Sequence, residues 1–219
     1  MKKVTLFMAA LVFLSACGNM ETQDKTVGQM MIARAKAVVS RPAPTTAVAP
    51  EPWTRAGLTA AGGPVILAYV PSRKAQASLG LAQESRGTRT YLSADGISLM
   101  IQNGILTGTR GFGDDLMSAG DTGLWSNLRR GSGSHTRVLR HLNGLDGLDV
   151  LTLSCTVTSQ GVHPITILGK SHRPRLMVET CTGGTGPIHN KFLIENGSIV
   201  QSVQWISPSV DQIIIEQVQ

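Results

Sequence analysis

Aromatic residues and runs of positive charge are both scarce in this sequence of 219 residues. It contains two tyrosines, four phenylalanines and three tryptophans, and its formal net charge is +6. No stretch of the chain is dense in lysine and arginine. Proteins that bind nucleic acid usually set aromatic side chains among such basic residues. The composition therefore argues against a nucleic-acid partner.

The sequence also lacks the residue spacings of common catalytic and metal sites. None of the five histidines stands in an HxH or HExxH pattern, and the three cysteines include no CxxC pair. A complete GxxxxGKS or GxxxxGKT phosphate-binding pattern is absent as well. The segment GSGSH (131–135) has glycine where a GxSxG nucleophile motif needs serine, and it is predicted to be a flexible loop. We expect no metal and no cofactor.

The first sixteen residues have the pattern of a secretory signal peptide. Two lysines precede an apolar run (4–13) that is too short to span a bilayer. The segment LSAC (14–17) resembles a bacterial lipobox, in which the peptide is cut before the cysteine and the cysteine is acylated. A plain signal peptide with a chance cysteine is the alternative. We expect Cys17 to carry acyl chains that hold the protein at a membrane surface, and Gly18, in place of aspartate, favours the outer membrane.

The rest of the chain divides by composition into a tether and one domain. Residues 17–62 contain a polar stretch, an expected helix over 26–40 and a proline-rich segment, RPAPTTAVAPEP, that ends this helix. About 200 mature residues are enough to bury one good core. Residues 63–219 are therefore predicted to form a single domain.

Short strands and tight turns dominate the pattern of this domain. The segment PVILAYV (64–70) is continuously apolar and rich in β-branched residues. Asp-Gly and Asn-Gly pairs are strong hairpin signals, and they occur here at regular intervals. The expected turns are Asp95-Gly96, Asn103-Gly104, Asn143-Gly144, Gln160-Gly161 and Asn196-Gly197. The pattern predicts an antiparallel β-meander, and only residues 114–128 leave room for a further helix.

Two cysteines remain once Cys17 is assigned to lipid. Cys155 and Cys181 form an even pair in a chain that the signal peptide directs to an oxidising compartment, which predicts a disulfide. Two free buried thiols are the alternative. Closing a loop of this length would stabilise the fold by about 3–4 kcal/mol in the chain-entropy description.

The glycine-rich segment GILTGTRGFGDDLM (104–117) is the first candidate for chemistry. It lacks the third glycine of a dinucleotide-binding loop, and Asp114 and Asp115 would repel a pyrophosphate. A glycosidase needs two carboxylates at least about 5 Å apart. One of these aspartates would then need a distant second acid, such as Asp121 or Glu179, and nothing in the sequence singles one out.

A structural role is the stronger prediction for this segment. Glycines permit tight turning, and Asp114 or Asp115 is expected to cap a helix that begins near Leu116. Arg110 would pair with one of the two acids.

Two further groups of residues could face a ligand. Trp125 and Trp205 could stack on sugar rings, although tryptophan more often packs in a core. A solvated basic face, or alternatively a site for an acidic glycan, is expected from Arg129, Arg130, Arg137 and Arg140. The candidate contacts with glycan or a protein partner are Arg110, Asp114, Asp115, Trp125 and Trp205.

Several of these segments together carry a family resemblance. They are the lipobox at Cys17, NGILTGTRGFGDDLMSA (103–119), the cysteines in LSCTV and VETCTG, and HNKFLIENGSIVQSVQWISP (189–208). With them the chain resembles the YjbF/GfcB family of capsule and exopolysaccharide lipoproteins. The resemblance covers most of residues 90–219 and implies a mainly β fold, in which a strongly curved, half-barrel-like antiparallel sheet wraps one or two short helices.

The resemblance also implies a function without catalysis. Members of the family are encoded beside an outer-membrane β-barrel and periplasmic partners that make or export surface polysaccharide. We therefore expect a lipoprotein anchored through Cys17 to the periplasmic face of the outer membrane, where it assists assembly or export. Its expected partners are membrane lipid, the β-barrel, periplasmic export proteins and polysaccharide. The alternatives are a polysaccharide-trimming hydrolase or lyase that uses Asp114 or Asp115 with Arg110, and a carrier of lipid or lipoprotein.

Overall fold

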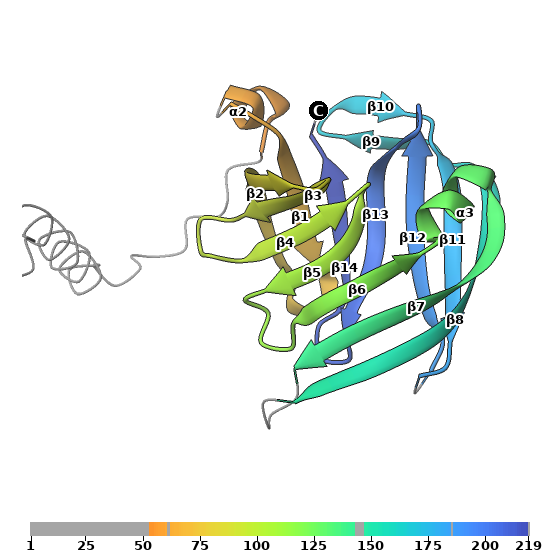
Figure 1. The fold of residues 1–219 in the computed structure, drawn as a ribbon. Coiled ribbons are helices and arrows are strands. Elements are labelled where there is room, and N and C mark those ends of the chain that lie inside the picture. Colours follow the sequence, from red (N-terminus) through yellow and green to blue (C-terminus); the bar gives the residue numbers. More distant parts are fainter. Residues whose placement is uncertain (1–52, 61, 143–146, 185, 219) are drawn as a thin grey trace, which may run out of the picture. The chain divides into compact units, whose positions relative to one another are not determined.

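The computed structural model describes residues 53–60, 62–142, 147–184 and 186–218 (Figure 1). These residues belong to one compact unit, Pro52–Gln219. The lipobox cysteine, the helix expected over residues 26–40 and the proline-rich segment after it lie outside the described residues. The turn expected at Asn143-Gly144 lies outside them too.

Twelve strands form one antiparallel sheet. In chain order they are β1 (Val65–Val70), β2 (Ala75–Ser85), β3 (Thr88–Leu92), β4 (Ser98–Gln102), β5 (Ile105–Arg110), β6 (Leu116–Thr122), β7 (Ser132–Leu142), β8 (Leu148–Val162), β11 (Arg175–Thr182), β12 (Ile188–Glu195), β13 (Ser198–Ser207) and β14 (Asp211–Gln217). A separate hairpin joins β9 (Ile165–Ile167) to β10 (Lys170–His172). The described helices are α2 (Arg55–Ala60), α3 (Leu124–Arg130) and a short 3-10 turn, η1 (Pro71–Arg73).

The strand order follows the chain almost throughout, as a meander does. Across the sheet it runs β5-β4-β3-β2-β1-β14-β13-β12-β11-β8-β7-β6, so the first and last strands pair in the middle. The outermost strands, β5 and β6, are consecutive in the chain and come together as the sheet curves (Figure 1). The Leu116 backbone N–H donates to Thr109 Oγ1 at 3.0 Å, and Arg110 Nη1 donates to the Leu116 carbonyl at 3.3 Å. The predicted mainly β, strongly curved antiparallel fold is confirmed, and its sheet is nearly closed.

Local turn chemistry explains the hairpins. Asn103 and Gly104 have φ angles of 52° and 79°, and Asn196 and Gly197 have 50° and 77°. Two successive positive φ angles are typical of the type I′ turn, whose twist matches that of the strands it joins. The predicted turns at both Asn-Gly pairs, and the turn at Asp95-Gly96 between β3 and β4, are confirmed.

Two local predictions are wrong. The Gln160-Gly161 pair lies within β8, where the register against β11 shifts between Arg175 and Met177, so the glycine at φ 79° forms a bulge and not a turn. Residues 132–135 begin β7 and do not form a flexible loop. In both cases continuous pairing with a neighbouring strand outweighs a local signal that favours a turn or loop.

The helix expected to begin near Leu116 is also wrong. Leu116 begins β6, which pairs with β7, and the helix in this region, α3, begins at Leu124 after Gly123. Tertiary pairing therefore overrides the capping signal of the two aspartates. Gly131, at φ 95°, ends α3 by donating its N–H to the Asn127 carbonyl.

Helix α3 fills one end of the curved sheet. Its Leu124 and Leu128 side chains are fully buried. They belong to a cluster with Ile105 of β5, Val157 of β8 and Phe192 of β12, and β5 is far from the other two strands in the sheet order. Burying each leucine contributes about 2 kcal/mol. A second and larger cluster, which includes Tyr91, Leu99, Leu153 and Ile213, fills the rest of the interior.

The meander gives the sheet two ends with different loops. The end that carries α3, the β9–β10 hairpin and the β2–β3, β4–β5 and β12–β13 turns is called the α3 end (Figure 1). The β1–β2, β3–β4, β5–β6, β7–β8 and β13–β14 connections lie at the opposite end. Among the described residues, no helix combines the length and the apolar character needed to span a membrane.

Candidate functional site

The β5–β6 turn is organised by the Asp115 carboxylate. One oxygen accepts from Thr109 Oγ1 at 2.7 Å and from the Phe112 N–H at 3.2 Å, and the other accepts from the Gly111 N–H at 2.9 Å. Gly111 and Gly113 have φ angles of 98° and 87°, which only glycine adopts without strain. Asp115 therefore fastens the turn that joins the two outermost strands, and it does not cap a helix.

Arg110 is occupied by the same turn. Its Nη1 atom donates to the backbone carbonyls of Thr109 and Leu116. Among the described ion pairs, none joins Arg110 to Asp114 or Asp115, so the expected pairing is not formed. The arginine instead holds β5 against β6.

Asp114 forms its hydrogen bonds with the β13–β14 connection and not within this turn. Its carboxylate accepts from Ser209 Oγ at 2.9 Å and from the Ser209 N–H at 3.4 Å. It lines an open groove of about 520 Å³ at the end opposite α3. This Asp114 groove is also lined by His141, Asp149, Trp205 and the exposed side chains of Leu142 and Val150.

Trp205 and His141 form the aromatic wall of the Asp114 groove. Their ring centroids are 5.7 Å apart and their planes meet at 81°, an edge-to-face arrangement. His141 Nε2 donates to the Ile206 carbonyl at 2.7 Å, which fixes the ring. The Trp205 backbone N–H donates to Asn190 Oδ1 at 2.7 Å. The hydrogen bond to Ile206 thus holds the His141 ring, and the Asn190 bond fixes the Trp205 backbone beside it.

The Asp114 carboxylate is negatively charged near neutral pH. Partial burial opposes ionisation, but the hydrogen bonds from Ser209, with a smaller electrostatic contribution from His141, outweigh burial and lower the pKa of Asp114. A carboxylate of this kind accepts hydrogen bonds from ligand hydroxyl groups. It is poorly suited to be the general acid of a glycosidase, which needs a raised pKa.

Trp125 lies at the other end of the molecule. It lines a groove of about 410 Å³ at the α3 end, together with Arg89, Tyr91 and His172. The residues that the sequence grouped as ligand contacts therefore do not form one site. Asp114 and Trp205 line one groove, Arg110 and Asp115 build the turn beside Asp114, and Trp125 belongs to a different surface.

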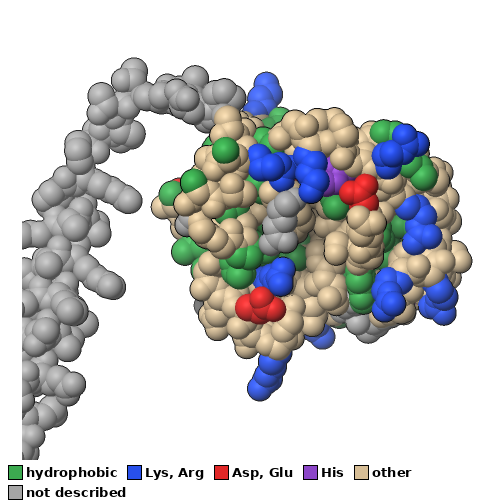
Figure 2. Space-filling model, turned by 90° about the horizontal axis from the view of Figure 1, so that it is seen from above, with side chains coloured by type: hydrophobic (Ala, Val, Ile, Leu, Met, Phe, Trp, Pro, Cys, Tyr) green, Lys and Arg blue, Asp and Glu red, His purple; other side chains and the backbone are tan. Residues whose placement is uncertain are grey.

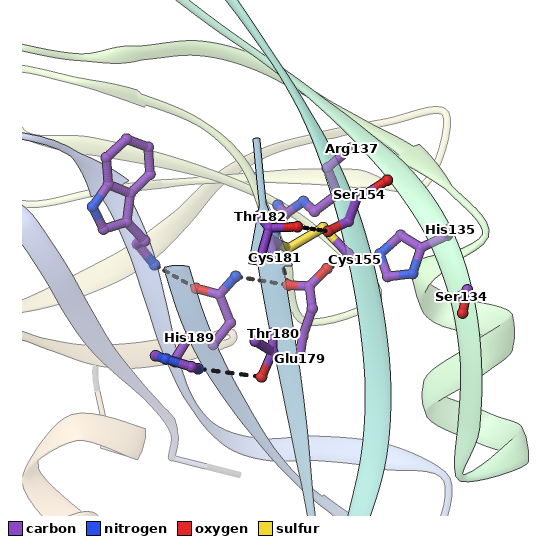
Figure 3. The surroundings of a disulfide bond; sticks show 12 residues. Ser134, His135, Arg137, Ser154, Cys155, Glu179, Thr180, Cys181, Thr182 and His189 are labelled. Atoms are coloured by element: carbon purple, nitrogen blue, oxygen red, sulfur yellow. Dashed lines mark hydrogen bonds and ion pairs between the residues drawn. A yellow bond between two sulfur atoms is a disulfide. The ribbon is translucent and has the colours of Figure 1, made fainter. Parts of the chain in front are cut away.

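A buried polar cluster adjoins the disulfide between Cys155 and Cys181 (Figure 3). The two cysteines lie directly opposite each other on β8 and β11, with their sulfur atoms 2.03 Å apart. The side chain of Glu179, two residues before Cys181, is fully buried. Its carboxylate contacts His135 Nε2 at 2.8 Å, Arg137 Nη1 at 3.0 Å and Asn190 Nδ2 at 2.6 Å.

This cluster corrects two predictions from the sequence. Arg137 does not belong to a solvated basic face, because it is 5% exposed and bonded to Glu179. Glu179 is not available as the second acid of a glycosidase, because substrate cannot reach it. Burial alone would raise the pKa of Glu179, but the Arg137 charge and the hydrogen bonds from His135 and Asn190 lower it overall.

Part of this cluster has the proximity of a metal site, but not the ligand chemistry. Ligand atoms of His135, Cys155 and Glu179 lie within 4.8 Å of one another. The Cys155 sulfur is bonded to Cys181 and offers no thiolate, and the Arg137 cation already neutralises Glu179. Sequence reasoning missed this cluster because its members come from three strands and meet only through the sheet register. Its one sequence signal is the same-face spacing of His135 and Arg137.

The fold is similar to that of a protein of known structure. A solved structure, the hypothetical lipoprotein YmcC from Escherichia coli (K12), is similar with a TM-score of 0.66 and 18% sequence identity. The likeness covers 86% of this chain and 94% of that chain, and at this identity it shows the fold alone. None of the curated proteins matches the chain.

The family follows from the sequence itself. The family model described as "Group 4 capsule polysaccharide lipoprotein gfcB, YjbF" matches residues 35–218. The chain therefore belongs to this family of capsule polysaccharide lipoproteins, and the predicted resemblance is confirmed.

Proposed function

We propose that this protein is a non-enzymatic accessory in the assembly or export of capsule or exopolysaccharide. Its family is associated with capsule polysaccharide, which supports the substrate class. The lipobox supports acylation at Cys17, and Gly18 supports attachment to the periplasmic face of the outer membrane. An outer-membrane β-barrel and periplasmic export proteins are the proposed protein partners.

We propose that the Asp114 groove is the glycan-binding site. Trp205 offers an apolar ring to the face of a sugar, and the Asp114 carboxylate accepts hydrogen bonds from sugar hydroxyls. Two aspartates line the groove and would repel an acidic sugar. The preferred ligand is therefore a neutral or amino sugar within the polymer.

The carboxylates favour binding over hydrolysis. Among the described carboxyl groups whose pKa departs from the ordinary value, those of Asp114, Glu179 and Glu195 are all lowered. A glycosidase needs one carboxyl group with a raised pKa as its acid. Asp115, the other acid of the alternative hydrolase, is engaged by three hydrogen bonds within its own turn.

Size exclusion tests the proposal directly. The non-acylated chain from Gly18 is mixed with capsular polysaccharide from the source organism, and both components are followed in the eluate. Co-elution with a polymer of unchanged length is expected. Trp205→Ala should weaken binding about tenfold, as loss of a stacking partner does. Trp125→Ala, in the other groove, is the matched control and should bind as the parent does.

Each other outcome is informative. A polymer that becomes shorter would restore the hydrolase or lyase, and Asp114→Asn would then be the first variant to assay. An unchanged polymer without co-elution would contradict direct glycan binding and leave the protein partners as the ligands. Equal losses in the two tryptophan variants would place the glycan outside the Asp114 groove.

A further inference from the structure

Unpaired positive charge gathers at the α3 end. Arg86 lies in the β2–β3 turn, Arg129 on α3, Lys170 on β10 and Arg173 just after β10. All four residues are exposed. Within the described part of the chain, none of their side chains forms a hydrogen bond or an ion pair. These four residues are called the basic rim. Figure 2 looks onto this end and shows Lys and Arg side chains spread around it, with few acidic side chains between them.

Two of the acids at this end have partners of their own. Glu84 pairs with Arg89 at 3.0 Å. Glu195 accepts from His172 Nδ1 and from the Arg173 N–H, both at 2.7 Å. The Lys170 charge also attracts the Glu195 carboxylate and helps to lower its pKa. Arg86, Arg129 and Arg173 form no ion pair in the described part of the chain. The opposite end carries Asp95, Asp114, Asp149 and Asp211 together with Arg73, Lys74, Arg110 and Arg140, so charges of both signs are mixed there.

The α3 end also carries apolar side chains. Val162, at the end of β8, is 59% exposed. The groove at this end is lined by Trp125 and by His172, whose buried Nε2 atom has no partner among the described residues. Tryptophan beside basic residues is typical of a surface that meets a lipid bilayer at the level of the headgroups.

The chain enters the folded unit at this same end. Helix α2 is fastened there, because Arg55 Nη2 donates to the Ile167 carbonyl of β9 at 2.8 Å and Arg55 Nη1 donates to the Val218 carbonyl. The segment that leads back to the lipobox cysteine therefore joins the domain at the basic rim. The roughly 35 residues between Cys17 and the described part of the chain could span ~100 Å if extended, which is long enough to permit contact between the rim and the membrane.

We infer that the α3 end is a membrane-facing surface whose basic rim binds anionic phospholipid headgroups. Together with acyl chains at Cys17, such a rim supplies the second signal that fixes a lipid-anchored domain against a bilayer. It would turn the Asp114 groove away from the membrane, toward the periplasm. Only this orientation rests on the proposed function; binding of lipid by the rim does not.

Vesicle sedimentation tests the inference. The non-acylated chain from Gly18 is incubated with vesicles of phosphatidylcholine, with and without phosphatidylglycerol, and the bound fraction is measured. Binding is expected only to the phosphatidylglycerol vesicles and should fall as salt is added. Each rim charge should contribute roughly fivefold to binding. The double variant Arg129→Gln, Arg173→Gln should therefore bind at least about tenfold more weakly.

A matched variant separates the rim from net charge. Lys74→Gln, Lys191→Gln removes two exposed charges away from the rim and should bind nearly as the parent does. Equal losses in the two double variants would overturn the inference, as would failure of the parent to bind phosphatidylglycerol vesicles. If the parent binds alginate but not these vesicles, the rim is a site for acidic glycan. The assay contains no capsular polysaccharide, so its outcome is independent of the Asp114 groove.

Discussion

Replacing Glu179 with glutamine should strongly destabilise the protein. The variant keeps the size of the side chain but removes the charge that faces Arg137, and it turns an amide donor toward the donors of Arg137 and Asn190. Arg137 is 5% exposed, and its Nε atom already lacks a partner among the described residues. Removing one partner of a buried ion pair costs about 3–5 kcal/mol, since the other charge stays buried. For a protein of this size the melting temperature should fall by about 6–20 °C.

Urea unfolding followed by circular dichroism measures this loss, with Glu84→Gln as the matched control. Glu84 also pairs with an arginine at 3.0 Å, but both side chains are nearly half exposed. An exposed pair contributes at most about 1 kcal/mol. If the free energy of unfolding falls equally little in both variants, the buried cluster does not stabilise the fold as argued.

Lowering the pH should reduce the stability of the parent protein more than that of Glu179→Gln. The pKa of Glu179 is lower in the folded protein than in the unfolded chain, so the unfolded state takes up the proton first. The contribution of Glu179 is therefore complete above the ordinary glutamate pKa of about 4.3 and is lost as pH falls through the folded-state value. The gap between the parent and Glu179→Gln should close in that range. A gap that stays constant with pH would refute the charge argument.

Three further perturbations have clear expected outcomes. Reducing the disulfide, which closes a loop between cysteines 26 residues apart, should lower the free energy of unfolding by about 3–4 kcal/mol; a smaller change in urea unfolding would point to a constrained unfolded state. Gly104→Ala should cost at least about 2 kcal/mol, because its φ is 79° and a new Cβ would lie 2.7 Å from Ile199 Cβ. Gly197→Ala has a similar φ and open space, so it should cost about half as much, and equal melting temperatures would refute the steric argument. Asp115→Ala should speed amide hydrogen exchange in β5 and β6 while leaving β12 protected, and uniform exchange across the sheet would contradict its local role.

The sequence predicted the parts of the fold that are encoded locally. The turns at Asn103-Gly104 and Asn196-Gly197 could be predicted because a type I′ turn needs two positive φ angles in a row, which Asn-Gly adopts readily. The turn predicted at Gln160-Gly161 was wrong for the same reason, since a bulge inside a strand can also use a glycine with positive φ. The residue pair alone cannot distinguish a turn from a bulge. A bulge forms where the neighbouring strand continues to pair on both sides of the glycine.

The candidate site was less accessible to sequence reasoning. Asp114 and Trp205 were both named as ligand contacts, but their meeting in one groove depends on the β5–β6 turn closing against the β13–β14 connection. Trp125 is close to Asp114 in the chain yet lies at the other end of the sheet, because β6 runs between them. The Glu179 cluster likewise requires the register of β7, β8, β11 and β12.

The pairing of β1 with β14 has a consequence for how the chain can fold. The first strand of the sheet finds its second neighbour only in the last residues of the chain, Asp211–Gln217. Such contacts between distant residues slow folding, because a long loop must close before they form. A chain that emerges from its N-terminus, from a ribosome or a translocation pore, therefore cannot complete this sheet until its final strand is released. The topology therefore makes the closing of the sheet at β1 and β14 a late event in folding.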